Sequence, residues 1–463
     1  MTELFTAPIE LRPVMPATGG PEWPGATWVG QLDTAELDLA DRSADITVTC
    51  RPLGADGYTR ARLLIRESVV LVRFTESPLE NGLATVTIPP CDETRDNGDA
   101  PSRPVSVVVC TRERPEHLRS ALASLTLLDH PDLEIIVVDN APATDATARV
   151  VDECDDPRVR LVTEPTPGLS AARNTGLLAA SHEIVAFTDD DVVVDQRWIT
   201  GLLAGFARAD DVACVCGLVP SGELRTPAQA YFDWRVSWAD NIVARRYSLL
   251  DPPDDVPLFP YQVGIYGTGA NFAVDRDRIV RLGGFDEALG AGTTTMGGED
   301  LDIFLRVLQA GYSLVSEPAA IVWHRHRSDN EALLSQARGY GAGLGAVLTK
   351  IAFDRAHRRL AFSVLRKRFR AVSRASAAYG GVCRPPDHVL VDISASVGRS
   401  RCSQSCAVRW PSPADGEQVV TPPRSTRHAT ARSSIPVRSD DNERTDPYRE
   451  RQRASADLGS RHR

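Results

Sequence analysis

The chain has 463 residues, a hydrophobic fraction of 42% and a charged fraction of 25%, values typical of a globular protein with a sizeable core. Its net charge of −10 argues against a generic nucleic-acid binder, although residues 351–378 hold eight Lys and Arg against one acid. No stretch approaches the ~18 apolar residues of a membrane-spanning helix. Because the N-terminus also lacks a secretory pattern, we expect a cytoplasmic protein. The nine cysteines are scattered without metal-type spacing and imply no disulfide framework.

The first 100 residues are rich in Pro, Gly and Asp and contain two strand-like runs, ARLLIRESVVLVRF (61–74) and LATVTIP (83–89). We therefore predict a small β-containing accessory domain over residues 1–100. A polar stretch at 91–104 reads as the linker to the next part of the chain.

From residue 105 onward, short apolar runs alternate with segments of helical spacing. Strands that are apolar on both faces and alternate with helices indicate a mainly parallel sheet covered by helices on both faces. Ligands bind such sheets beyond the carboxyl ends of the strands, and several of these strands end in polar residues. The predicted strands are 105–110, 133–139, 159–164 and 183–189, and the predicted helices are 115–128, 144–153 and 170–180.

Three segments differ from this alternation. Residues 220–260 form a long Pro-containing segment with clustered aromatic residues, and such an insertion is usually a lid or an acceptor loop. Residues 332–378 have helical spacing, interrupted by a glycine cluster at 339–345 that we expect to be flexible. Residues 379–463 are rich in Arg, Ser and Pro, and we predict that this tail is disordered.

Asp189, Asp190 and Asp191 directly follow an apolar run. Three adjacent carboxylates at the end of a buried strand are costly unless a cation pairs with them. Carboxylates two residues apart can reach one hard divalent cation, and such a cation can also bridge the phosphates of a nucleotide diphosphate. An acidic turn that caps the next helix is the alternative, and the triplet alone leaves both interpretations open.

A set of ordered motifs in residues 105–326 resembles the family 2 glycosyltransferases, which are inverting enzymes with the GT-A fold. The motifs are VVVCTRERPEHL, IIVVDN, GLSAARNTGL, FTDDDV, GTGANFAV, GGFDE, GGEDLDIFLR and VWHRHR. The resemblance covers roughly half of the chain and implies a GT-A domain over 103–330. It implies transfer of a sugar from a nucleotide-diphosphate sugar, with a UDP-sugar favoured, to a hydroxyl acceptor. Cell-envelope, glycolipid or polysaccharide synthesis is the expected setting, with an acceptor that is lipid-linked in many bacterial members.

The resemblance implies a metal site at the acidic triplet. Asp191 would be the main ligand of a Mn²⁺ or Mg²⁺ ion, and Asp189, with Asp190, would assist the metal or contact the ribose. His324 follows the apolar run AAIVW and would supply an imidazole to the same ion. A mixed carboxylate and imidazole site suits Mn²⁺ as well as Mg²⁺.

A second group of residues is predicted to bind the nucleotide. By the resemblance, Asp139 would accept a hydrogen bond from the base, although a turn residue or helix cap fits the position equally well. Thr111, Arg112 and Arg114 follow the first strand and would bracket the base and reach the diphosphate, although many family members carry an aromatic residue in place of Arg112. Arg173 lies near a helix N-terminus, where anions bind well, and its alternative is a surface arginine.

Glu299 and Asp300 follow two glycines and open a helix, where the helix dipole favours acids. In the resembled family the Asp of this pair is the general base, so Asp300 would take a proton from the acceptor hydroxyl. Glu299 would orient the sugar or the acceptor. One base without a second positioned nucleophile implies a single displacement with inversion.

Other functions remain open at this point. A nucleotidyltransferase has a similar sheet and an Asp-rich metal site, but it usually needs a Gly-rich loop that contains Lys, and this chain has lysine only at positions 350 and 367. A glycosidase fits less well, because the acids lie among nucleotide-type motifs. A non-catalytic module that binds nucleotide sugars would not need Asp191, Asp300 and His324 together.

Residues 351–372 place apolar side chains among many cations. Such a helix can lie on an anionic membrane surface, so we predict a peripheral contact with the inner face of the membrane. The alternative is that the apolar side chains pack on the catalytic domain and the arginines pair with its acidic residues. The apolar residues are Ile351, Leu360, Phe362, Leu365, Phe369 and Val372.

Overall fold

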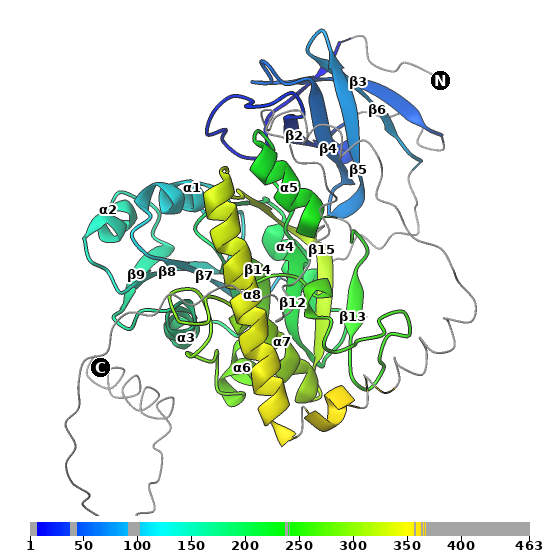
Figure 1. Cartoon of the computed structure of the whole chain (residues 1–463). Coiled ribbons are helices and arrows are strands. Elements are labelled where there is room, and N and C mark those ends of the chain that lie inside the picture. The colour runs from blue at the N-terminus through cyan, green and yellow to red at the C-terminus, as the bar shows by residue number, and fades with distance from the viewer. Residues whose placement is uncertain are drawn as a thin grey trace, which may run out of the picture. The chain divides into compact units, whose positions relative to one another are not determined.

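The computed structural model describes residues 7–37, 44–90, 102–236, 239, 241–355, 358–362, 364 and 366. Within these residues the strands form two β-sheets, and both sheets belong to one compact unit (Figure 1). The predicted tail at 379–463 lies outside the described residues. Among the helices that the structure describes, none has the length and apolarity needed to cross a bilayer.

The N-terminal sheet has six strands in the order β1-β3-β6-β5-β4-β2. The predicted strand at 61–74 is two strands, because the backbone reverses at Ser68, whose φ is 54°. Leu63 and Ile65 of β4 are fully buried and pack with Trp28 into a core of their own. The bounds are β1 Ile9–Leu11, β2 Thr27–Asp33, β3 Ile46–Pro52, β4 Arg60–Glu67, β5 Val70–Glu80 and β6 Leu83–Ile88, with a 3₁₀ helix, η1, at Thr34–Glu36.

The second sheet has nine strands in the order β11-β15-β12-β14-β10-β7-β8-β9, and β13 pairs with β15. The four predicted strands are confirmed as β7 to β10, and they run parallel to one another. The complete sheet is mixed, because β14 runs antiparallel between β10 and β12, and β11 and β13 run antiparallel to β15. The bounds are β7 Val105–Thr111, β8 Leu133–Asn140, β9 Val159–Glu164, β10 Ile184–Thr188, β11 Val192–Val194, β12 Val212–Leu218, β13 Arg245–Tyr247, β14 Asn271–Asp275 and β15 Ser313–His324.

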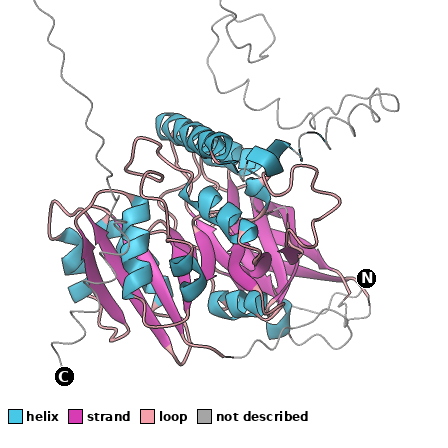
Figure 2. Cartoon of the chain, turned by 90° about the horizontal axis from the view of Figure 1, so that it is seen from below, coloured by secondary structure: helices cyan, strands magenta, loops and turns pink. Residues whose placement is uncertain are grey.

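Helices cover both faces of this sheet (Figure 2). Successive residues of a strand point to opposite faces, so Val107 and Val109 of β7 pack with α1 and α4 while Val108 packs with α3 and α7. The predicted helices are confirmed as the first three of the α-helices, and the α/β fold class is confirmed with them. The bounds are α1 Pro115–Leu125, α2 Ala146–Asp152, α3 Leu169–Ala179, α4 Trp198–Phe206, α5 Pro227–Val236, α6 Arg276–Arg281, α7 Glu299–Gln309 and α8 Asn330–Phe353, with η2 at Val263–Ile265.

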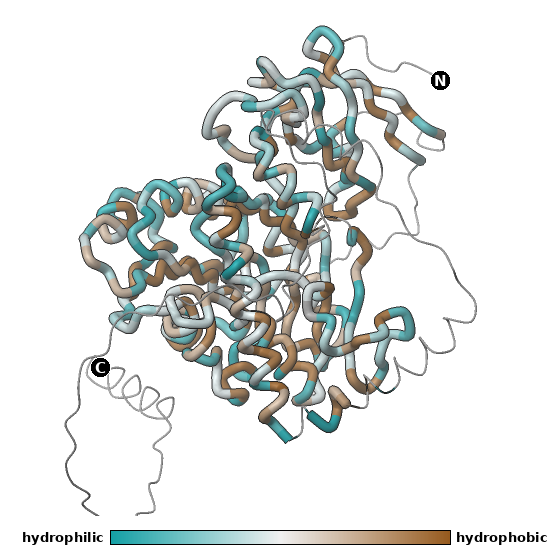
Figure 3. The backbone as a smooth tube through the Cα atoms, in the orientation of Figure 1, coloured by the Kyte–Doolittle hydropathy of each residue, from teal (hydrophilic) through white to brown (hydrophobic). Residues whose placement is uncertain are grey.

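Hydrophobic residues gather along the strands and on the helix faces that pack against them (Figure 3). This pattern follows from burial, because strands covered on both faces can be apolar at every position. In β10, all five residues from Ile184 to Thr188 are buried. The polar residues that follow such strands therefore mark the places where the chain leaves the core.

The C-terminal helix α8 differs from its prediction in two ways. The glycine cluster at 339–345 does not interrupt the helix, because all seven residues lie inside one continuous helix. The helix ends at Phe353, where Asp354 adopts an extended conformation (φ −77°, ψ 129°), so 351–372 is not one uninterrupted helix. Ile351 is only 7% exposed and belongs to the core. The predicted apolar residues Leu365, Phe369 and Val372 lie outside the described residues.

A buried ion pair joins the two sheets. The Nη1 atom of Arg66 in β4 lies 2.8 Å from Oδ2 of Asp195, and these side chains are 1% and 3% exposed. Asp195 directly follows β11, the strand that begins after the acidic triplet. Arg197 also pairs with Asp33 at the end of β2. The N-terminal sheet is thus fastened to the segment that follows the acidic triplet.

We predict that Arg66→Met lowers the free energy of unfolding by about 3–5 kcal/mol, because it leaves the Asp195 carboxylate buried without its cation. Urea unfolding followed by circular dichroism measures the change. Arg60→Met is the matched control, because the pair of Arg60 with Glu76 has side chains 52% and 33% exposed and should contribute only about 0–1 kcal/mol. Equal losses in the two variants would contradict a stabilising role for the buried pair.

Candidate functional site

The candidate site lies where β7, β10 and β15 end. Thr111 is the last residue of β7, the acidic triplet follows β10, and His324 is the last residue of β15. The antiparallel pairing of β11 with β15 places Val192 opposite His324, which brings the imidazole beside Asp191. The strand ends therefore bring together residues that are more than 200 positions apart in the sequence.

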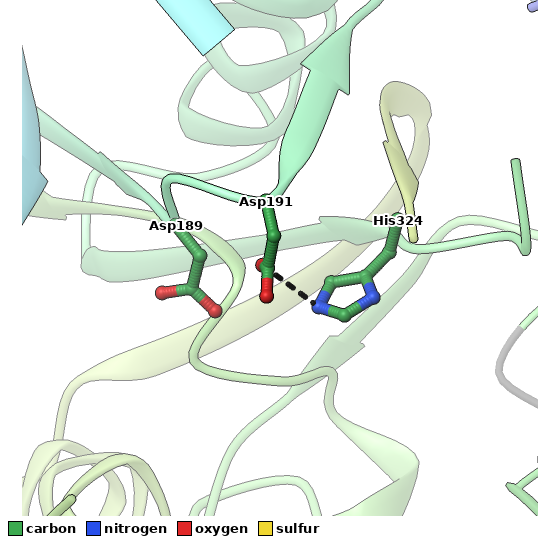
Figure 4. A group of neighbouring side chains, drawn as sticks. All are labelled: Asp189, Asp191 and His324. Carbon is green, nitrogen blue, oxygen red and sulfur yellow. Dashed lines mark ion pairs between the residues drawn. The ribbon is translucent and has the colours of Figure 1, made fainter. Parts of the chain in front are cut away.

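Asp189, Asp191 and His324 form a group with the donor atoms of a metal site (Figure 4). One carboxylate oxygen of each aspartate and one imidazole nitrogen all lie within 4.8 Å of one another. The His324 Nε2 atom is 3.3 Å from Asp191 Oδ1, and both side chains are about nine-tenths buried. Two carboxylates and one imidazole suit Mn²⁺ or Mg²⁺, so the residues present fit a divalent cation.

Asp190 points toward protein groups that hold it in place. Thr111 Oγ1 donates to Asp190 Oδ2 at 2.7 Å, and Arg114 donates to the other oxygen of Asp190. A second nitrogen of Arg114 donates to Asp191 Oδ2 at 2.9 Å. Arg114 is thus one cation shared by two neighbouring carboxylates, and it precedes α1 as the N-cap residue. The predicted residues Thr111, Arg114 and Asp190 therefore contact one another at the sheet edge.

The three aspartates have different electrostatic surroundings. Burial raises the pKa of Asp189 to about 7, although Arg173 opposes it, and burial raises the pKa of Asp190 to about 6, although Arg114 opposes it. Burial also acts on Asp191, but His324 and Arg114 together hold the pKa of Asp191 well below its usual range. In return, Asp191 raises the pKa of His324 against the effect of burial. Asp191 is therefore the member of the triplet that is ionised most readily.

Arg173 lies at the centre of the site and is only 2% exposed. Its Nη1 atom donates to Glu299 Oε1 at 2.9 Å, and its Nη2 atom donates to the carbonyl oxygen of Gly269 at 2.8 Å. The Nη2 atom also lies 3.7 Å from Asp189 Oδ1, and the guanidinium carbon is 5.4 Å from the centroid of the Phe272 ring. The alternative of a surface arginine is therefore wrong. Arg173 connects the acidic triplet, the loop before β14 and the start of α7.

Glu299 and Asp300 open α7 behind Gly298, whose φ of 93° is strained for any residue with a side chain. Glu299 is 6% exposed, and its Oε2 atom has no hydrogen-bond partner within the described part of the chain. Burial and the neighbouring Asp300 raise the pKa of Glu299. Asp300 is less buried, and its Oδ2 atom accepts from the Gly269 amide at 2.9 Å. Asp300 is thus the more accessible carboxylate of the pair.

Two predicted residues lie at the margin of this cluster. Asp139 is the partner of Thr111 in the pairing of β7 with β8, it is 3% exposed, and burial raises its pKa. Its Oδ1 atom has no hydrogen-bond partner among the residues described. Arg112 is exposed beside Glu113, so the structure does not bring it into the buried cluster.

The structure adds residues that the sequence interpretation left unassigned. The His326 ring lies 4.8 Å from the His324 ring and 4.4 Å from the Phe232 ring, measured between centroids. Phe232 lies in turn 6.3 Å from Tyr340 of α8. Arg327 Nη1 is 3.8 Å from Asp191 Oδ2. Two features of the sequence could have pointed to these residues: the aromatic cluster in 220–260 and the alternating His and Arg of the VWHRHR motif.

Comparisons with known proteins identify relatives of this chain. The family model for glycosyl transferase family 2 matches residues 106–259. The succinoglycan biosynthesis protein ExoM of Rhizobium meliloti is 30% identical over 239 residues, which cover 50% of this chain and 69% of that protein. The pre-mycofactocin glycosyltransferase of Mycobacterium tuberculosis is 31% identical over 246 residues, which cover 52% of this chain and 46% of that protein.

The match therefore spans less than half the length of the mycobacterial relative. Among solved structures, a crystal structure of GalNAc-T7 with UDP, GalNAc and Mn²⁺ is 20% identical and has a TM-score of 0.38. That similarity covers 50% of this chain and 45% of the other.

Proposed function

The chain belongs to glycosyl transferase family 2, and from this premise we propose that it is a metal-dependent, inverting glycosyltransferase. It would move a sugar from a nucleotide-diphosphate sugar to a hydroxyl acceptor. The observation that carries the proposal is the grouping of Asp189, Asp191 and His324 next to the two acids that open α7. Arg173 contacts both parts of this arrangement, so a donor and a base would face each other across one buried guanidinium.

Asp191, Asp189 and His324 would hold the Mn²⁺ or Mg²⁺ ion. When bound, such an ion stabilises the negative charge of the departing diphosphate. Arg114 keeps Asp191 ionised and fixes its orientation, because the guanidinium donates to Asp190 and Asp191 at once. The residues of the chain thereby hold the carboxylates of this group in place before any ligand arrives.

Nucleotide binding would occur at the ends of β7 and β8. Asp139 has a buried oxygen without a partner among the described residues, which supports a role in accepting a hydrogen bond from the base. Thr111 pairs with Asp139 and donates to Asp190, and Arg114 donates to Asp190 and Asp191. Thr111 and Arg114 would therefore lie between the base and the diphosphate. Arg112, exposed at the margin, would contact the nucleotide from the solvent side. Asp189 and Asp190 would reach the ribose.

Asp300 would act as the general base. The Gly269 amide donates to one of its oxygens, and the amide of Leu301 donates to the other, so the carboxylate is oriented by backbone groups. It would take the proton of the acceptor hydroxyl as that oxygen attacks the anomeric carbon from the face opposite the diphosphate. Glu299, fixed by Arg173, would orient the sugar or the acceptor. A single displacement of this kind inverts the anomeric centre.

The remaining assignments concern donor, acceptor and setting. We favour a UDP-sugar as donor, a lipid-linked or envelope acceptor, and a cytoplasmic location for the enzyme. Residues 1–100 would be an accessory domain that supports the catalytic sheet through the Arg66–Asp195 pair. A nucleotidyltransferase and a non-catalytic binding module are the competing functions. Slow release of nucleoside diphosphate from a nucleotide sugar without acceptor supports the transferase, and a binding module releases none.

We also propose that the segment beginning at residue 351, at the end of α8, contacts the inner membrane face. Phe353 is 83% exposed and Phe362 is 69% exposed, while Ile351 is buried and unavailable. Exposed Arg355, Arg358 and Arg359 lie between the two phenylalanines, and exposed Arg366 follows them. An exposed apolar pair among cations suits an anionic lipid surface.

We predict that Asp191→Asn weakens the binding of UDP with Mn²⁺ by at least about 10–100-fold. Loss of a residue that only orients a metal ligand typically costs about this much, and loss of the ligand itself should cost no less. Titration calorimetry with and without EDTA measures this effect. Asp155→Asn, at an exposed aspartate, is the control and should bind like the wild type. Wild-type affinity that is unchanged by the chelator would overturn the metal assignment.

We predict that Asp300→Asn lowers turnover of the nucleotide sugar by about 10²–10⁴-fold while UDP binding is preserved, because the amide cannot accept the proton. Steady-state kinetics and calorimetry separate the two effects. Asp277→Asn is the control, because Asp277 is an exposed acid in the first turn of α6. A variant at 300 that keeps near wild-type turnover would show that another group is the base.

We predict that the protein sediments with vesicles containing anionic phospholipid at low salt and that Phe353→Ser with Phe362→Ser weakens this binding. Each basic residue near the surface contributes about 1 kcal/mol, and added salt screens it. Leu250→Ser is the control, because Leu250 is also 83% exposed but lies in another segment. Absence of binding at low salt, or equal binding by all variants, would reject the membrane contact.

A further inference from the structure

Two glycines of α8 lie directly on the backbone that leads into α7. A Cβ atom at Gly343 would lie 2.5 Å from the carbonyl carbon of Gly297 and 2.8 Å from the amide nitrogen of Gly298. A Cβ atom at Gly339 would lie 3.4 Å from the carbonyl oxygen of Met296. The backbone of α8 thus packs directly against the backbone of residues 296–298. We call Gly339 and Gly343 the glycine seat of residues 296–298.

The other two glycines of the cluster have no such contact. A Cβ atom at Gly341 or Gly345 would meet nothing within 4 Å. Glycine weakens a helix interior, so a helix with four glycines in seven residues needs a compensating reason. The close approach of α8 to residues 296–298 explains why glycine is needed at Gly339 and Gly343, and it does not apply at Gly341 and Gly345. The same helix therefore contains both the test positions and their matched controls.

The position of α8 is fixed independently of the seat. One and two turns after Gly343, Val347 and Ile351 lie in the core, 2% and 7% exposed. Lys350 Nζ lies 2.7 Å from Asp286 and 2.6 Å from Asp302 of α7. The α8 helix lies next to α7 (Figure 1), and these contacts hold the seat in place against residues 296–298.

The residues on the seat lead directly to the site. Gly298 is the N-cap of α7, with a φ of 93°, and a Cβ atom there would lie 2.8 Å from the carbonyl oxygen of Gly343. Glu299 and Asp300 follow at once, and their contacts with Arg173 and Gly269 depend on where this first turn lies. A shift of Gly298 would therefore move both carboxylates.

We infer that Gly343 is a positioning residue, through which α8 holds the first turn of α7 so that Asp300 faces the donor. The inference rests on the proposed function, in which Asp300 is the base. A methyl group at 343 would displace Gly297 and Gly298 by roughly 1 Å to reach ordinary contact distance. A misplacement of that size at a reacting group costs about 10²-fold in rate.

The experiment compares Gly343→Ala with Gly345→Ala in the full chain. We expect Gly343→Ala to lower kcat for hydrolysis of the nucleotide sugar that the wild type turns over by about 10²-fold. Its affinity for UDP with Mn²⁺, measured by calorimetry, should stay within about twofold, because the metal group and Asp139 are not on the seat. Gly345→Ala should retain wild-type kcat. Gly339→Ala, which inserts a methyl group at a looser contact, should give a smaller loss of the same kind.

Amide hydrogen exchange provides a measurement that does not need turnover. Exchange at residues 298–301 should be faster in Gly343→Ala than in Gly345→Ala. Equal kcat and equal exchange in the two variants would overturn the inference, and so would a parallel loss of UDP affinity, which indicates general disruption. A wild-type chain that hydrolyses no nucleotide sugar would overturn the proposed function instead, and the exchange comparison would still decide whether α8 holds the first turn.

Discussion

The site depends on one buried cation. The guanidinium of Arg173 contacts the Glu299 carboxylate and the Gly269 carbonyl and lies near Asp189, so three segments that are distant in sequence meet around it. Removing one partner of such a buried pair typically costs about 3–5 kcal/mol, because the remaining charge is left without compensation. The same contacts exclude solvent from the guanidinium, which lies close to the Phe272 ring. Arg173 therefore offsets the repulsion between Asp189 and Glu299, while Arg114 and His324 do so for the rest of the triplet.

Around this centre, each acid has a different constraint and hence a different chemical character. Asp191 is held ionised by Arg114 and His324, Glu299 is buried against Arg173, and Asp300 is oriented by backbone amides while remaining more accessible. The N-terminal sheet also supports this region, because its Arg66 pairs with Asp195, the residue that follows β11. A readily ionised carboxylate, a buried carboxylate with a raised pKa and a more accessible carboxylate thus arise from similar side chains through their neighbours alone.

The periodic parts of the molecule were predictable from sequence, and the parts decided by tertiary contact were not. β7 to β10 and α1 to α3 follow from local apolar spacing, and the polar residues after β7 and β10 indicated the sheet edge. The three residues of β11 form a strand only because β15 pairs with them, and β14 runs antiparallel for reasons that lie in its neighbours. The sequence left a surface arginine open as the alternative for Arg173, because nothing local reveals that Glu299 lies beside it. The α8 glycines suggested flexibility because their contact, Gly297, is more than 40 residues away.

The nearly complete replacement of lysine by arginine has a consequence for chemistry at the protein surface. Lys350 and Lys367 are the only lysines, and Lys350 joins α8 to Asp286 and Asp302. Reagents and enzymes that modify side-chain amines therefore have few targets in this chain, and one of them is the anchor of α8. Acetylation of Lys350 would remove its positive charge while leaving the two carboxylates in place. Protection of this amine against a mass-tagging reagent would thus report, in a single peptide, whether α8 is docked on α7.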